Sequence, residues 1–214
     1  MKQRVSVFFC FLLAFLLVGC APKTCLHYDY PAANSSCYTN LKVSIAQPED
    51  KRQPNEDIDK MWANNPTEDI QKVMTEELKA TGLFNEVIPL ASDQLGDNAS
   101  VALTSTVTEL SWEIPNRKEQ ENKMMAVSIF TGGIGAMIYG SGETPFWGKA
   151  TMRLNLKENE TEKVLLDKEY TAQVEEQMTR FKTDSYVERS RVIGLAVKQI
   201  MEEFKTDLTQ TITQ

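Results

Sequence analysis

The amino-terminal segment constrains this chain more than any other stretch. Lys2 and Arg4 form a short basic region, and an apolar run from Val5 to Val18 follows, interrupted only by Ser6. This order predicts a secretory signal peptide, because a membrane-spanning helix needs about 20 apolar residues. We therefore expect the mature chain to lie outside the cytoplasm.

The signal ends in Leu17-Val18-Gly19-Cys20, which resembles the lipobox of bacterial lipoproteins. The resemblance implies removal of residues 1–19 and lipidation of Cys20, with a diacylglyceryl group and an amino-terminal acyl chain such as palmitate. Two or more acyl chains anchor a protein stably, at about 0.8 kcal/mol per buried CH₂. Ala21 replaces the Asp that commonly retains lipoproteins in the inner membrane, so the resemblance also implies the periplasmic face of the outer membrane. The alternative is an ordinary signal peptide with an incidental cysteine.

The charge of the mature chain restricts its partners. Removing residues 1–19 takes away two basic side chains and leaves 21 Lys plus Arg against 30 Asp plus Glu, a net charge of about −9. An acidic surface repels phosphate backbones, which argues against nucleic acid as a partner. It also offers no polybasic patch for anionic headgroups, so we expect the lipid to provide the membrane attachment.

Cys25 and Cys37 are the cysteines that remain once Cys10 is removed with the signal and Cys20 is lipidated. An exported protein meets oxidising conditions, so we predict a disulfide between them, closing a loop worth about 3 kcal/mol. Two free thiols are the alternative. Residues 20–40 show little periodicity and predict a lipidated tether, which as a flexible coil would reach about 25 Å.

Two helices have clear sequence signals. Asn65 is a good N-cap, Pro66 suits the first helical position and Gly82 suits a left-handed end, so we predict a helix between them. A second helix is predicted from Ser185, whose partner Glu188 would complete a capping box, to about residue 210.

Strands are indicated by alternation of apolar and polar residues. The apolar phase slips between Val107 and Leu110, which predicts a β-bulge there. Two helices on one face of a mixed or mostly antiparallel sheet make a single α+β sandwich domain over residues 41–214. The expected strands lie at 41–45, 84–90, 101–114, 146–156 and 164–174, the last two joined by a hairpin loop at 157–163.

This pattern resembles envelope lipoproteins whose domain is similar to the amino-terminal domain of the Tol translocation protein. The group includes auxiliary lipoproteins of envelope ABC transporters and the periplasmic part of the curli secretion lipoprotein. The resemblance rests on the strand Leu41–Ile45, on the helix end Glu76-Glu77-Leu78 with Gly82-Leu83-Phe84, and on the long carboxy-terminal helix. It implies a role in an envelope transport or assembly machine.

The residues give little support for catalysis. His27 is the only histidine and lies in the predicted tether, so a Ser-His or Cys-His mechanism within the domain lacks its base. No Cys-x-x-Cys pair or His-based metal site is present in the sequence. Gly148-Lys149 lacks the hydroxyl residue of a phosphate loop, since Ala150 follows. We expect no enzyme activity, no metal and no cofactor.

The stretch from Met124 to Gly142 is an apolar, Gly-rich insertion of nineteen residues without a charge. Gly132, Ala136 and Gly140 recur at a spacing that permits close helix contact. Three interpretations stay open: an insertion packed on its own domain, an exposed element for a protein partner or for self-association, and a membrane-inserting segment. The candidate partner- or membrane-contact residues are Ile129, Phe130, Ile134, Met137, Ile138 and Tyr139.

The functional hypothesis is therefore a lipid-anchored accessory or assembly protein of a bacterial envelope machine that acts by protein–protein binding. Its partners are the membrane, through the lipid, and an envelope protein or a second copy of the chain. One alternative is a self-oligomerising, pore-related lipoprotein similar to the curli secretion protein. A further alternative is a carrier that holds a lipid or small molecule between sheet and helices.

Overall fold

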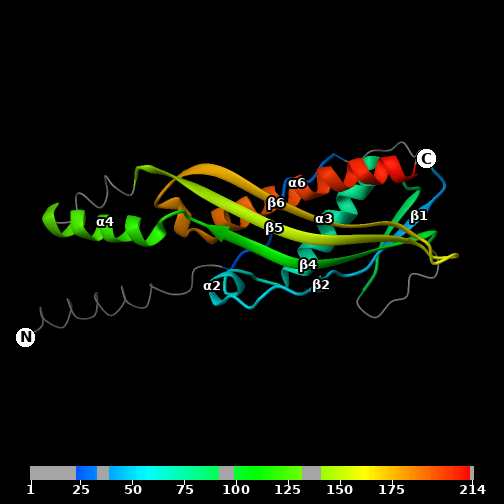
Figure 1. Ribbon diagram of the computed structural model, residues 1–214, viewed down its shortest axis with the longest axis horizontal. Helices are drawn as coiled ribbons and strands as arrows, with labels where there is room; N and C mark the ends of the chain where they lie inside the picture. Colours follow the sequence, from blue (N-terminus) through cyan, green and yellow to red (C-terminus); the bar gives the residue numbers. More distant parts are fainter. Residues whose placement is uncertain (1–22, 33–38, 92–98, 132–140, 213–214) are drawn as a thin grey trace, which may run out of the picture.

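The computed structural model describes residues 23–32, 39–91, 99–131 and 141–212. A mixed six-stranded sheet has the order β3-β1-β4-β5-β6, and β2 also pairs with β4 (Figure 1). β1 runs parallel to β3 and β4, whereas β4, β5 and β6 are antiparallel. The strands are β1 (Lys42–Ile45), β2 (Glu49–Asp50), β3 (Glu86–Pro89), β4 (Val101–Glu113), β5 (Glu143–Glu158) and β6 (Val164–Thr179).

Helices cover one face of this sheet, so the predicted α+β class is confirmed. The two large ones are α3 (Pro66–Thr81) and α6 (Tyr186–Ile212), and both contribute to one core with the sheet. The remaining elements are α2 (Glu56–Asp59), α4 (Arg117–Thr131) and the 3-10 turn η1 (Lys182–Asp184).

The sequence signals for α3 act as predicted. The Asn65 side chain accepts a hydrogen bond from the Thr67 N–H at 3.1 Å, and Pro66 opens the helix. Gly82 ends it with φ 65°, the left-handed conformation that glycine adopts most easily. The apolar stripe of α3 is buried against the sheet.

β4 and β5 also follow their sequence pattern. The register of the β4–β5 ladder shifts between Val107 and Glu109, which confirms the predicted bulge. Alternate side chains of β5 are fully buried beneath α6, namely Phe146, Ala150, Met152, Leu154 and Leu156. β6 continues to Thr179, beyond the predicted end at residue 174, because it pairs with the full length of β5.

Residues 24–30, which we call the N-terminal strap, are packed onto the helices where the sequence predicted a flexible tether. The Leu26 N–H donates to Asp69 Oδ2 of α3 at 2.7 Å, and the His27 N–H donates to Ser190 Oγ of α6 at 2.7 Å. The Leu26 and Tyr28 side chains are buried. A Cβ on Gly194 would lie 2.0 Å from the His27 carbonyl oxygen, so only glycine permits this approach. These residues are therefore fixed on the domain and do not form a flexible coil.

A buried polar network holds the strap at its far end. The Tyr28 hydroxyl donates to the Glu77 carboxylate, which is 1% exposed, and Lys205 Nζ lies 2.7 Å from the same group. Burial and the Glu77 hydrogen bond raise the pKa of Tyr28 far above its ordinary value, so its hydroxyl stays a donor. Burial opposes the charge on Lys205, but its hydrogen bonds to Glu202 and Glu77 raise its pKa overall.

Candidate interaction site

Helix α4 projects from the end of the domain opposite the C-terminus and extends beyond the sheet (Figure 1). It has two halves: the charged half, Arg117–Lys123, and the apolar half, Met124–Thr131. Within the apolar half, Phe130 is 89% exposed, Ile129 is 74% exposed and Met125 is 64% exposed. The interpretation that the insertion packs on its own domain is therefore wrong for residues 124–131.

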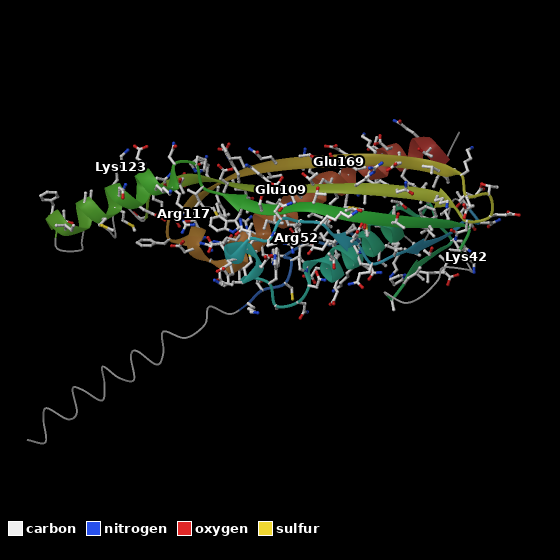
Figure 2. The ribbon with its side chains drawn as sticks, turned by 60° about the horizontal axis from the view of Figure 1, so that its bottom comes forward. Lys42, Arg52, Glu109, Arg117, Lys123 and Glu169 are labelled. Atoms are coloured by element: carbon white, nitrogen blue, oxygen red, sulfur yellow. The ribbon has the colours of Figure 1, made fainter. Side chains whose placement is uncertain are left out.

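The charged half carries its own ion pairs. Arg117 Nε lies 2.7 Å from Glu121 Oε1, and Lys123 Nζ lies 2.6 Å from Glu119 Oε1, both at helical i,i+4 spacing. The hydrogen bond from Lys123 lowers the pKa of Glu119. Figure 2 shows Arg117 where α4 meets the domain and Lys123 farther out along the helix. This half is thus suited to water, unlike the half that follows it.

The first turns of α4 are fixed to the domain by hydrogen bonds. Gln120 Nε2 donates to the Pro115 carbonyl at 2.9 Å and to Thr144 Oγ1 of β5 at 3.0 Å. Its Oε1 accepts from Arg180 Nε at 3.3 Å. The Arg117 guanidinium lies 5.4 Å from the centre of the Trp112 ring. These contacts set the direction in which the helix leaves the sheet.

A second core supports the same end. Ile114, Phe146, Met178 and Val192 are buried together beside Trp112. The Arg189 guanidinium stacks 3.9 Å from the centre of the Trp112 ring. Arg189 also donates to the Thr183 carbonyl at 2.9 Å and to Asp184 Oδ1 at 3.1 Å. Burial lowers the pKa of Arg189, against the attraction of Asp184.

A pocket of about 240 Å³, which we call the root pocket, lies between the first turns of α4 and η1. Phe181 borders it and is 59% exposed. The sequence carries no signal for this site, because residues from the end of β4, from α4 and from the loop after β6 meet only in the fold. Its lining consists of Ile114, Arg117, Gln120, Glu121, Met124, Arg180, Phe181, Thr183 and Asp184.

A more polar pocket of about 420 Å³ opens on the uncovered face of the sheet. Arg153 and Asp167 pair across it through two hydrogen bonds of 2.8 and 2.7 Å. The hydrogen bond from Arg153 lowers the pKa of Asp167, so the two charges neutralise each other. In the described ranges, no three His, Cys, Asp or Glu side chains gather in a group that could hold a metal ion.

No protein-family model matches the sequence, and no curated protein matches it significantly. The fold does have solved relatives. A Xanthomonas campestris protein of family DUF330 has a TM-score of 0.54 at 10% identity, with 91% of this chain and 100% of that chain covered. This likeness supports the α+β fold alone.

Two other solved structures are more distant, and neither carries an inference. A hypothetical protein from Chlamydia trachomatis has a TM-score of 0.47 at 7% identity, covering 81% of this chain and 98% of its own. Lipoprotein GNA1162 from Neisseria meningitidis has a TM-score of 0.41 at 10% identity, covering 78% and 99%.

The structure describes some of the predicted site residues, and the others lie outside the described ranges. Ile129 and Phe130 are exposed on the outer part of α4, and their contact with a partner or the membrane stays a prediction. Cys25 is exposed and free, whereas Cys37 lies outside the described residues, so the disulfide also stays a prediction. Cys20, Ile134, Met137, Ile138 and Tyr139 lie outside the described residues as well.

Proposed function

We propose that this chain is a lipid-anchored accessory protein at the periplasmic face of the bacterial outer membrane, and that it works by binding another protein. The lipobox-like ending at Cys20 supports the anchor. A non-catalytic role is supported by the only histidine, His27, which is exposed on the N-terminal strap and does not line the root pocket.

The root pocket is the observation that carries this proposal. Protein interfaces combine an apolar centre, often aromatic, with a polar rim, and Arg is enriched among their strongest contacts. The pocket has this composition. Its apolar lining residues are Ile114, Met124 and Phe181, and its charged lining residues are Arg117, Arg180, Glu121 and Asp184. We expect the partner to place an apolar side chain against Phe181.

The proposal is tested by native mass spectrometry of the lipidated protein, gently extracted from its own membrane. Phe181→Ser removes the exposed aromatic side chain, and Val164→Ser is the matched control, because Val164 is 51% exposed at the far end of β6. Burial of a Phe side chain contributes about 1.5–3 kcal/mol, so Phe181→Ser should weaken a hetero-complex by roughly 10- to 100-fold. The control should retain it.

Each other result counts against the proposal in a different way. A hetero-complex that survives Phe181→Ser rules out the root pocket as the contact. A large homo-oligomer supports the self-associating, pore-related alternative. A monomer with a bound small molecule supports the carrier alternative, and a bare monomer contradicts partner binding.

A further inference from the structure

The apolar half of α4 is apolar on all its sides. Successive residues of a helix are about 100° apart, so the large side chains of this half point in all directions. A helix of this kind is surrounded by apolar material in its working state, either a protein core or lipid. Here it is exposed instead. The large apolar side chains are Met124, Met125, Val127, Ile129 and Phe130.

The length of the apolar half matches one leaflet of a bilayer. Its eight residues, Met124–Thr131, are about 12 Å long at 1.5 Å per residue. The hydrocarbon of one leaflet is about 15 Å deep, half of a typical bilayer core. The last charged residue of α4 is Lys123, so the charges end where hydrocarbon would begin. Among the described residues, no helix is long and apolar enough to cross a membrane.

Thr24, four residues after Cys20 in the sequence, is bound near the same end of the domain. Thr24 forms backbone hydrogen bonds of 2.8 Å with Met61 and Ala63, just after α2. Ile58 of α2 lines one pocket with Glu109, Leu110 and Ser111, in the part of β4 that leads to α4, which places α2 beside that end of β4. In Figure 1, α2 lies toward the end from which α4 projects.

The reach of the chain from Lys23 to Cys20 is compatible with the length of the charged half of α4. Cys20 is three residues from Lys23, a separation of at most about 11 Å. The charged half of α4, Arg117–Lys123, is about 10 Å long. A domain held this closely by acyl chains on Cys20 brings the apolar half of α4 within reach of the same leaflet.

We propose that the apolar half of α4 inserts end-on into the leaflet that holds the acyl chains of Cys20. Its ligand is the acyl-chain region of phospholipids, which needs no basic patch and therefore suits an acidic protein. The interaction shares with the proposed function only the lipidation of Cys20. The inserted half includes only Met124 of the root-pocket lining, so the rest of the pocket stays open to a protein partner at the level of the headgroups.

The test is depth-dependent fluorescence quenching with the lipidated full chain in vesicles of phosphatidylethanolamine and phosphatidylglycerol. Phe130→Trp places a reporter near the tip of α4, and Val164→Trp places one at an exposed site at the opposite end of β6. Emission from Trp62, Trp112 and Trp147 is subtracted using the unchanged protein. Phospholipids brominated in the middle of their acyl chains should quench the Phe130→Trp signal and leave the Val164→Trp signal intact.

Equal quenching of the two reporters would overturn the insertion. A blue-shifted Phe130→Trp emission that appears only when membrane proteins are added, and resists brominated lipid, would overturn it too, because the helix then enters a protein socket. Adding Phe181→Ser to the Phe130→Trp protein should leave quenching unchanged. The experiment thereby distinguishes a failure of the partner-binding proposal from a failure of the insertion proposal.

Discussion

Replacing Gly194 with Ala should release the N-terminal strap from α6. The new Cβ would lie 2.0 Å from the His27 carbonyl oxygen and 3.1 Å from its carbon. Both are backbone atoms, so no side-chain rotation can relieve the overlap. Ile193 and Ala196, which lie one and two residues from Gly194 on α6, are fully buried, so movement of the strap is the easier response.

The free energy at stake follows from the contacts of the strap. Burial of Leu26 and Tyr28 contributes about 1.5–3 kcal/mol each, and four hydrogen bonds contribute about 1 kcal/mol each. Ordering the six residues 25–30, to which these contacts belong, costs about 1 kcal/mol per residue in chain entropy. The strap is therefore held by roughly 2 kcal/mol, and its loss should leave the rest of the fold intact.

Hydrogen exchange measured on the Cys20→Ser protein, which is not lipidated, checks this prediction. The amides of Leu26 and His27 donate to Asp69 and Ser190, and their exchange in Gly194→Ala should accelerate by about 30-fold, which corresponds to 2 kcal/mol. Ala favours a helix interior by up to about 1 kcal/mol over Gly, so urea unfolding should show a smaller net loss.

A control on the same helix separates the overlap from a general change in α6. Gln199→Ala alters an exposed position and should leave exchange of the strap amides unchanged. The reasoning is refuted if Gly194→Ala keeps the protection of both amides and unfolds at the same or a higher urea concentration. That result would mean that α6 yields and the strap does not.

Three further changes have defined outcomes. Glu77→Gln removes a buried charge that faces an ammonium and should cost about 3 kcal/mol in urea unfolding, whereas Glu76→Gln, more than a third exposed, should cost little. The hydrogen bond from Lys168 lowers the pKa of Asp207 below its ordinary value of 3.8. The ionised carboxylate therefore contributes stability that is lost as the pH falls from 3.8 toward the folded-state pKa. Asp207→Asn should make the loss of stability with falling pH shallower in that range. Gly82→Ala should cost about 1 kcal/mol, because φ is 65° there, and thermal melting would show it.

Local sequence signals were enough to predict most elements of the fold. Asn65 and Gly82 determine the ends of α3 through contacts with neighbouring residues, and the alternation within β5 reflects a single buried face. Such features need no knowledge of the distant chain. The bulge after Val107 was also predictable, because the shift in the alternation of apolar and polar residues lies within one strand.

The strap and the interaction site depend on contacts that sequence proximity does not reveal. Leu26 bonds to Asp69, and Cys25 and His27 bond to Ser190, so residues with few local signals are ordered by partners far along the chain. The absence of charges from Met124 onward was visible in the sequence, but the exposure of residues 124–131 was not, because burial depends on what the rest of the fold places beside them. Phe181 gave no signal at all.

The strap restricts how the domain can be oriented relative to a lipid anchor at Cys20, which a flexible tether would not do. A coil of twenty residues would let the domain rotate freely above the membrane, whereas hydrogen bonds to α3 and α6 fix the strap on the domain. If Cys20 carries lipid, folding itself decides which end meets the leaflet, and that end holds both α4 and the root pocket. A protein partner would then approach the root pocket along the membrane surface, because α4 and the leaflet close the other direction.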